Sequence, residues 1–242
     1  MARTTPELIT DIVRTLVAGM SFESKILDIE DLGNGQFKIT VCETFHAQSE
    51  CTQIMIGTEG PFQVNAVENN KSITFTAPAQ PTGSTFKLDH PYFTHGTRRQ
   101  ANLEMNAIKD DDKWPFIYLW EPISEQFPET PDGRIERNST LRILFASGRD
   151  ATLNTTDELY DDGIAPMWNL VHQFIYHLKK HRQIGDLDVN GGYTISNYAK
   201  LGKEDADGAE NAFFDQYLTG LQLTITIPVW KKFTCLPREC DC

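Results

Sequence analysis

The apolar positions of this chain change their spacing along its length, and each change marks a different kind of structure. Over residues 5–19 they recur every three or four positions, which predicts an amphipathic helix. From about residue 24 the spacing becomes two, the period of a β-strand. Turn signals at 33–35 (Gly-Asn-Gly), 59–60 and 69–71 divide this part into five or six short strands, the pattern of a small barrel or sandwich.

A different pattern follows a Pro- and Gly-containing segment at 78–85, which we interpret as a linker. Residues 97–108 predict a short helix, with Leu103, Ala107 and Ile108 facing inward.

Four apolar runs in the second half of the chain predict strands. The first, WPFIYLW at 114–120, is ended by Pro122, which cannot continue a sheet ladder. The others lie at 139–146 and near 193–198 and 221–230.

The longest predicted helix begins at Thr155 or Thr156, just before two acidic residues that suit a first turn. Its apolar stripe runs from Met167 to Leu178. Pro166 predicts a kink or a fresh helix start within this segment.

Together these elements predict an α+β fold, in which a sheet with flanking helices carries a small inserted all-β, barrel-like module. The main domain comprises residues 1–22 and 86–242, and the inserted β module comprises 23–85. Two sequential domains, split near residue 82, are the alternative that the sequence leaves open.

The charge of the chain narrows the classes of partner. Its 22 basic and 34 acidic residues give a net charge of −12, which disfavours tight binding of free nucleic acid or of an anionic membrane. No stretch approaches the ~18 consecutive apolar residues that a membrane helix requires. The N-terminal residues lack the pattern of a signal peptide, so we expect the thiols of the cysteines to be reduced. Those cysteines are Cys42, Cys51, Cys235, Cys240 and Cys242.

Glu121 and Glu125 follow the apolar strand and are the first candidates for catalysis. Two carboxyl groups about 5–9 Å apart are typical of glycoside hydrolases. Pro122 and Ser124 make this segment an irregular turn, however, and five acidic residues fall within 121–136. We therefore interpret the two glutamates as part of a solvated acidic loop.

Three histidines of the long helix are candidates for a metal site. His177 and His181 have the i, i+4 spacing that can share a metal, and His172 lies one turn earlier. The segment has no HExxH glutamate, and its neighbours are basic, which repels a cation. We interpret these histidines as the polar flank of an amphipathic helix, and the hypothesis of a metal-dependent hydrolase remains an alternative.

The C-terminal cysteines and the tryptophans are two further sets of candidate functional residues. The C-terminal CLPRECDC has C-x4-C-x-C spacing, which differs from the usual zinc knuckle, so we expect free thiols there. The tryptophans can stack on sugars, which keeps a carbohydrate-binding or glycan-active protein as a second alternative, although core positions fit them better. They are Trp114, Trp120, Trp168 and Trp230.

Complete catalytic motifs are missing from the sequence. It contains no G-x-S-x-G, no P-loop and no strand-linked G-x-G-x-x-G. We therefore predict no catalytic, cofactor-binding or metal site and expect a non-enzymatic structural protein without a cofactor.

The order of the elements resembles that of the neck and tail-completion proteins of tailed bacteriophages, particularly phages of Bacteroidetes, including the crAss-like group. The resemblance lies in an N-terminal helix, a small β insert, WPFIYLWEP, an acidic loop and STLRILFAS. A helix introduced by TTDELY and a closing segment FFDQYLTGLQLTITIPV complete it.

The resemblance implies a virion protein that is assembled in the host cytoplasm as a ring subunit at the head-to-tail connection. Its expected partners are further copies of the chain and other neck, portal or tail proteins, with no membrane. Genomic DNA would pass nearby without specific binding. The acidic segments 121–136 and 203–215 are candidates for a surface that repels DNA.

Overall fold

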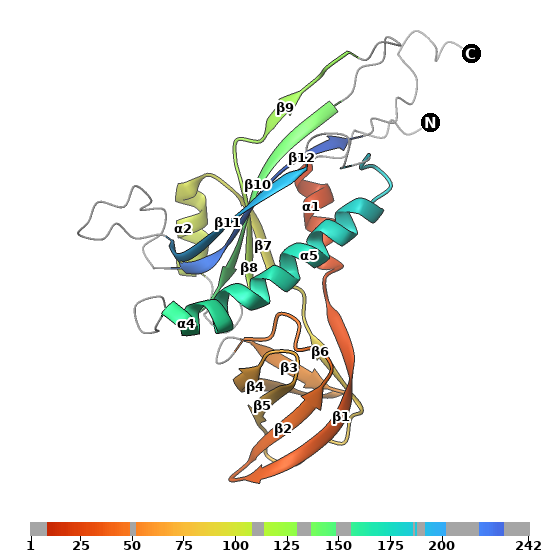
Figure 1. Cartoon of the computed structure of the whole chain (residues 1–242), viewed down its shortest axis with the longest axis vertical. Coiled ribbons are helices and arrows are strands. Elements are labelled where there is room, and N and C mark those ends of the chain that lie inside the picture. Colours follow the sequence, from red (N-terminus) through yellow and green to blue (C-terminus); the bar gives the residue numbers. More distant parts are fainter. Residues whose placement is uncertain are drawn as a thin grey trace, which may run out of the picture.

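The protein, described from a computed structural model, forms a closed six-stranded barrel and a mixed sheet that lies between helices (Figure 1). This confirms the predicted α+β fold with a barrel-like module. The structure describes residues 9–48, 52–107, 114–129, 137–148, 156–185, 187, 192–201 and 218–229.

The barrel consists of six antiparallel strands in the order β1-β2-β5-β4-β3-β6. Their alternating apolar side chains fill the interior, which is why the period-two pattern of the sequence closes into a barrel. The strands are β1 (Phe22–Gly33), β2 (Gln36–Val41), β3 (Gln53–Ile56), β4 (Glu59–Glu68), β5 (Ser72–Thr76) and β6 (Thr85–Leu88).

The barrel corrects two details of the sequence analysis. The turns predicted at 33–35 and 69–71 are confirmed, but the turn predicted at 59–60 lies instead at residues 57–58. Gly57 has a φ of 58° there, a conformation that glycine adopts without strain, and Glu59 already begins β4. The closing strand β6 includes Phe86–Leu88, three residues that the sequence had placed in the main domain.

The mixed sheet has the strand order β11-β12-β10-β8-β7, and a short strand pairs with β10 beside this path. β7 and β8 are parallel, and all the other pairs are antiparallel. The strands are β7 (Tyr92–Gly96), β8 (Phe116–Trp120), β9 (Ser124–Gln126), β10 (Arg137–Ser147), β11 (Tyr193–Leu201) and β12 (Leu218–Val229).

The buried residues of the first and the longest helix follow the apolar periodicity of the sequence. The long helix starts as a short α-helical and π-helical segment and begins afresh at Ala165, with Pro166 in its first turn, as predicted. No helix in the described parts of the chain is long and apolar enough to cross a membrane. The helices are α1 (Ile9–Ala18), α2 (Arg98–Ala107), α4 (Thr156–Glu158), the π-helix η1 (Leu159–Ile164) and α5 (Ala165–Lys180).

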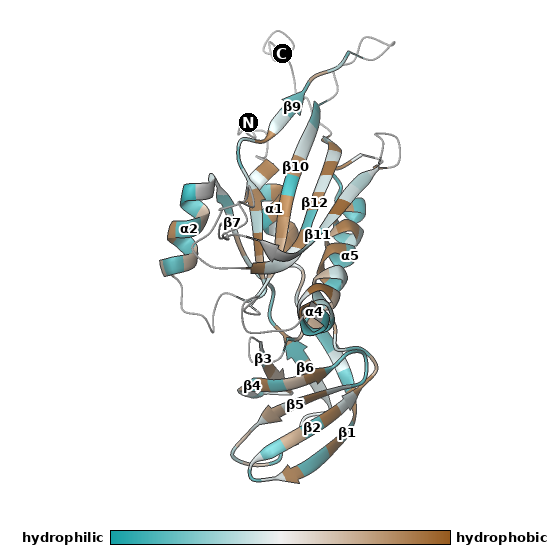
Figure 2. Cartoon of the chain, turned by 60° about the vertical axis from the view of Figure 1, so that its left-hand side comes forward, coloured by the Kyte–Doolittle hydropathy of each residue, from teal (hydrophilic) through white to brown (hydrophobic). Residues whose placement is uncertain are grey.

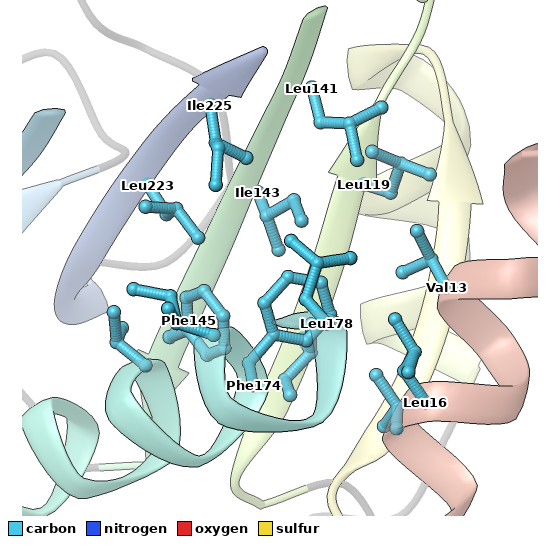
Figure 3. Close-up of a cluster of buried hydrophobic side chains, with 14 of the residues drawn as sticks. Val13, Leu16, Leu119, Leu141, Ile143, Phe145, Phe174, Leu178, Leu223 and Ile225 are labelled. Atoms are coloured by element: carbon cyan, nitrogen blue, oxygen red, sulfur yellow. The ribbon is translucent and has the colours of Figure 1, made fainter. Parts of the chain in front are cut away.

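The main core lies between one face of the sheet and the helices α1 and α5. Val13 and Leu16 of α1 meet side chains of β8, β10, β12 and α5 in this core (Figure 3). Phe145 and Phe174 pack edge to face across it, with ring centroids 5.8 Å apart. The apolar stripe predicted for the long helix is therefore its buried face.

The opposite face of the sheet is covered by α2, which makes three layers (Figure 2). Ala101 and Met105 of α2 pack on this face, whereas Leu103 is 61% exposed and Ala107 is also exposed. The predicted inward face of α2 is therefore wrong, and Ile108 lies outside the described residues. The sequence alone does not separate these faces, since apolar residues occur on both sides of this short helix.

We expect truncation of Met105 and of Leu103 to have opposite consequences for stability. Met105→Ala removes a side chain that is 2% exposed, so the free energy of unfolding should fall by about 2–5 kcal/mol. Leu103→Ala removes an exposed side chain and should change it by less than about 0.5 kcal/mol. Urea titrations monitored by circular dichroism compare the two variants, and equal losses would contradict this orientation of α2.

Candidate functional site

Glu121 and Glu125 do not form a pair, because each has partners of its own. The Glu121 carboxylate lies 2.6 Å from Nδ1 of His95, at the end of β7. The Glu125 carboxylate accepts hydrogen bonds from the Arg137 guanidinium and, at 3.3 Å, from the Ser139 hydroxyl. Glu125 belongs to the short strand β9, which pairs with β10, and not to the acidic loop that the sequence predicted.

His95 lies at the centre of a short chain of polar contacts. The parallel pairing of β7 and β8 places the imidazole beside the residue that follows β8, and the Glu121 amide donates to the Gly96 carbonyl at 2.8 Å. On its other side, Nε2 of His95 lies 3.3 Å from a guanidinium nitrogen of Arg14 in α1. Arg14 also contacts Asp11 at 3.2 Å.

The two contacts indicate which ring nitrogen carries the proton in a neutral His95 imidazole. Nδ1 donates to the carboxylate, so Nε2 is the acceptor for Arg14. A carboxylate that orients an imidazole is one half of a catalytic arrangement, but here the second nitrogen faces a cation rather than a nucleophile. The chain Arg14–His95–Glu121 therefore ties α1 to the parallel strands.

His172 and His177 lie in α5, whereas His181 is the extended residue that follows the helix, and its Nδ1 accepts from the Gln183 amide at 3.4 Å. The His172 ring packs against Trp168, and the His177 ring packs against Tyr176. Partial burial, followed by the charge of Lys180, lowers the pKa of His177, which favours its neutral form. Among the described residues, no group of three or more His, Cys, Asp or Glu side chains is placed to hold a metal ion.

The described tryptophans pack in the cores of the protein, whereas the described cysteine is exposed. Trp114 and Trp120 pack in the core under α2, and Trp168 packs partly buried against the main core. Cys42 is an exposed free thiol. The remaining candidates lie outside the described residues: Trp230, Cys51, Cys235, Cys240 and Cys242.

The barrel and the sheet have separate apolar cores, and polar contacts join them. The loop after β2 supplies most of these contacts. The Gln48 side-chain oxygen accepts hydrogen bonds from the Ser147 hydroxyl at 2.9 Å and from the Gly148 amide at 3.2 Å. The Asn169 side chain of α5 donates to the Phe45 carbonyl at 2.6 Å. A second contact runs from Asn69 to the π-helix, where its amide donates to the carbonyl of residue 161 at 2.9 Å.

His46 is fully buried in this loop. Its Nε2 lies 3.2 Å from the Asp89 carbonyl and must carry the proton, since a carbonyl oxygen only accepts. Among the described residues, neither Nδ1 of His46 nor the side-chain nitrogen of Gln48 has a hydrogen-bond partner. Burial lowers the pKa of His46 to about 4, because the charged imidazolium loses its hydration there.

At the end of the sheet opposite β7, the described residues leave one edge of β11 unpaired. Within the described residues, β11 pairs only with β12. β11 contains no proline, and Lys200, near its end, is its one charged residue; prolines and charges are the usual protections of a free strand edge. Beside this edge, polar side chains cover the face that α2 leaves open, among them Thr194, Ser196, Thr224, Thr226, Thr140 and Arg142.

Family models, curated proteins and solved structures were compared with this chain, and none matches it. Its function must therefore be inferred from its own contacts and surfaces. The polar junction and the unpaired strand edge are among the described features that the sequence did not predict.

We expect Gln48→Ala to destabilise the protein, because it removes the buried side-chain oxygen that accepts from the Gly148 amide and from the Ser147 hydroxyl. The expected loss is about 1–3 kcal/mol in the free energy of unfolding. Gln53→Ala, at an exposed position of β3, is the matched control and should change it by less than about 0.5 kcal/mol. Chemical denaturation of both variants measures the difference, and a silent Gln48→Ala would argue against a polar junction.

Because His46 is buried in its neutral form, we expect the folded protein to lose stability in mild acid. The unfolded chain binds a proton at the ordinary pKa of 6.5, and the folded chain binds it only near 4. Stability is therefore complete above about pH 6.5 and falls as the pH drops towards 4, by about 3 kcal/mol in all. Unfolding free energies measured from pH 7 to pH 4 check this.

The comparison with two variants isolates the contribution of this imidazole. His46→Gln should weaken the pH dependence, whereas His172→Gln, at an exposed position of α5, should leave it unchanged. An unaltered pH dependence in His46→Gln would assign the acid sensitivity to other groups.

Proposed function

We propose that this chain is a non-enzymatic structural subunit of a ring at the head-to-tail connection of a tailed bacteriophage, through which DNA passes. The open edge of β11 is the observation that carries the proposal. A nine-residue edge strand with few protections against pairing is a hazard for a protein that works alone and a contact surface for one that assembles.

The arrangement of the two modules supports assembly into a ring. A closed ring joins two different surfaces of the same subunit, because each copy contacts its neighbours head to tail. The β11 edge and the distal end of the barrel are well separated in the fold (Figure 1). A subunit of this shape offers distinct surfaces to its two neighbours.

The charge of the chain agrees with the passage of DNA. A net charge of −12 repels the phosphate backbone, so a channel built from such subunits would not hold the genome in place. Residues 130–136 and 203–215 of the acidic segments lie outside the described residues, so the position of this charge on a ring stays a prediction.

The order of the elements also supports this function. A barrel inserted between the first helix and the sheet, and a long helix between β10 and the closing pair of strands, is the order that resembles the neck and tail-completion proteins. That likeness suggests the phage connection as the place of assembly.

Measurement of assembly tests the proposal. Native mass spectrometry and negative-stain microscopy of the purified chain should find a closed ring of identical subunits. Mass spectrometry of purified particles of the encoding phage should find several copies per virion. A chain that remains monomeric at all accessible concentrations and is absent from the particles would exclude the function.

A charged substitution in β11 tests whether this strand edge takes part in ring formation. Ser196→Lys adds a charge at an exposed position of β11 and should weaken ring formation, since charged residues discourage strand addition. Leu103→Lys adds the same charge at an exposed position of α2 and should leave assembly unchanged. Equal assembly of both variants would show that subunits meet elsewhere.

A further inference from the structure

The hairpin of β1 and β2 carries two leucines that the backbone turns outward. Leu27 and Leu32 are 62% and 46% exposed. Each lies between two residues of β1 that pair with consecutive residues of β2, so each is the extra residue of a β-bulge. A bulge changes the direction of a side chain, which explains why these leucines point to solvent. Bulges often lie at functional places.

Acidic residues surround the two leucines. Asp28, Glu30 and Asp31 are all exposed on β1, and Lys38, which pairs with Glu30 across the hairpin, is the cation of this segment. The hairpin from residue 26 to residue 41 therefore has a net charge of −2 (one Lys against three Asp/Glu). We call this surface the acidic leucine hairpin.

The C-terminal end of α5 has the complementary character. Residues 163–185 contain no acidic residue, in a chain with a net charge of −12, and Lys179, Lys180 and Arg182 are exposed at the end of the helix. Tyr176 is 55% exposed on the same end, with the ammonium of Lys180 4.0 Å from its ring centroid. We call this surface the basic tyrosine end.

We propose that the acidic leucine hairpin of one subunit binds the basic tyrosine end of a second copy of this chain. The inference rests on the proposed ring and names one contact that closes it. Opposite charges select this pairing over contacts between like surfaces, and the leucines add apolar area against the exposed tyrosine ring. Lysine stems next to the ring extend that apolar area.

The two surfaces differ and lie far apart on one subunit, so their contact joins unlike surfaces of two copies. The hairpin forms the outer end of the barrel, and the basic tyrosine end lies beside the sheet, far from the hairpin in two views (Figures 1 and 2). One subunit therefore cannot satisfy both surfaces by itself, and a second copy must supply the partner. Such a contact leaves the hairpin of each subunit directed at the next one.

Charge reversal with rescue tests the contact. Asp28→Lys with Glu30→Lys changes the hairpin from −2 to +2, and Lys180→Glu with Arg182→Glu changes the helix end from +3 to −1. Each double variant should raise the concentration for half-assembly by about tenfold or more, because like charges then face one another. The variant with all four substitutions should recover most of the loss. Concentration series in native mass spectrometry measure these values.

Matched controls separate this contact from a general effect of charge or folding. Asp157→Lys with Asp161→Lys, on α4 and η1, changes the net charge by the same amount as the hairpin variant. This control should assemble like the unmodified chain. Leu27→Ser with Leu32→Ser keeps all charges and should also weaken assembly. Circular dichroism confirms that each variant is folded, and higher salt should weaken assembly of the unmodified chain.

The outcomes distinguish this contact from the proposed function. Rings that form equally well in the unmodified chain and in both charge-reversed variants would overturn the contact and leave the ring in place. Loss of assembly in one variant without rescue would show that this surface binds a different partner. An unmodified chain that remains monomeric would overturn both the contact and the ring.

Discussion

The packing of α5 on β10 and β12 is the interaction on which the rest of the structure depends. Phe145, Phe174 and Leu178 are fully buried where the helix crosses these strands (Figure 3). Burial of one such side chain contributes about 1.5–3 kcal/mol, and α1 adds its own apolar stripe to the same layer. Because α1 is held there, the chain must leave the layer after residue 20 and return at β7. The barrel occupies the sequence between these two points.

That topology explains why the two modules meet through polar groups. The barrel fills its interior with its own apolar side chains, and the sheet uses both faces for helices, so neither has apolar surface left for the other. Backbone groups of the loop after β2 still need partners where they are buried. Asn169 donates to the Phe45 carbonyl of this loop, and Gln48, which belongs to the loop, accepts from Ser147 and Gly148 of the sheet. The neutral state of His46 is the consequence of enclosing an imidazole in the same place.

The elements that the sequence predicted well are those with a strong period and clear ends. The helix stripes, the hairpin at 33–35 and the strands at 114–120 and 139–146 have such signals, and the fold class followed from their order. β7 was missed because its five residues are followed at once by a helix signal and its parallel pairing with β8 leaves no local pattern. The inward face of α2 was also wrong.

The interactions of the candidate residues depend on pairs that are far apart in sequence. His95 was never considered beside Glu121, since only the parallel register of β7 and β8 brings them together. Likewise, Gln48 and Ser147 are 99 positions apart, and no local pattern relates them. What the sequence did supply was the negative inference that Glu121 and Glu125 need not act together, which rests on the irregular turn around Pro122.

The proposed ring requires contact surfaces that do not also promote aggregation of separate subunits. An apolar contact surface large enough to hold a ring by itself would also promote aggregation before assembly. Here the exposed apolar side chains of the hairpin are few and lie among acidic residues, and the open sheet face is built from hydroxyl groups and an arginine. Separate subunits with a net charge of −12 repel one another at long range, so association requires the right surfaces to meet at short range. Specificity in such a protein comes from matched polar and charged groups, while each contact adds only a modest apolar area.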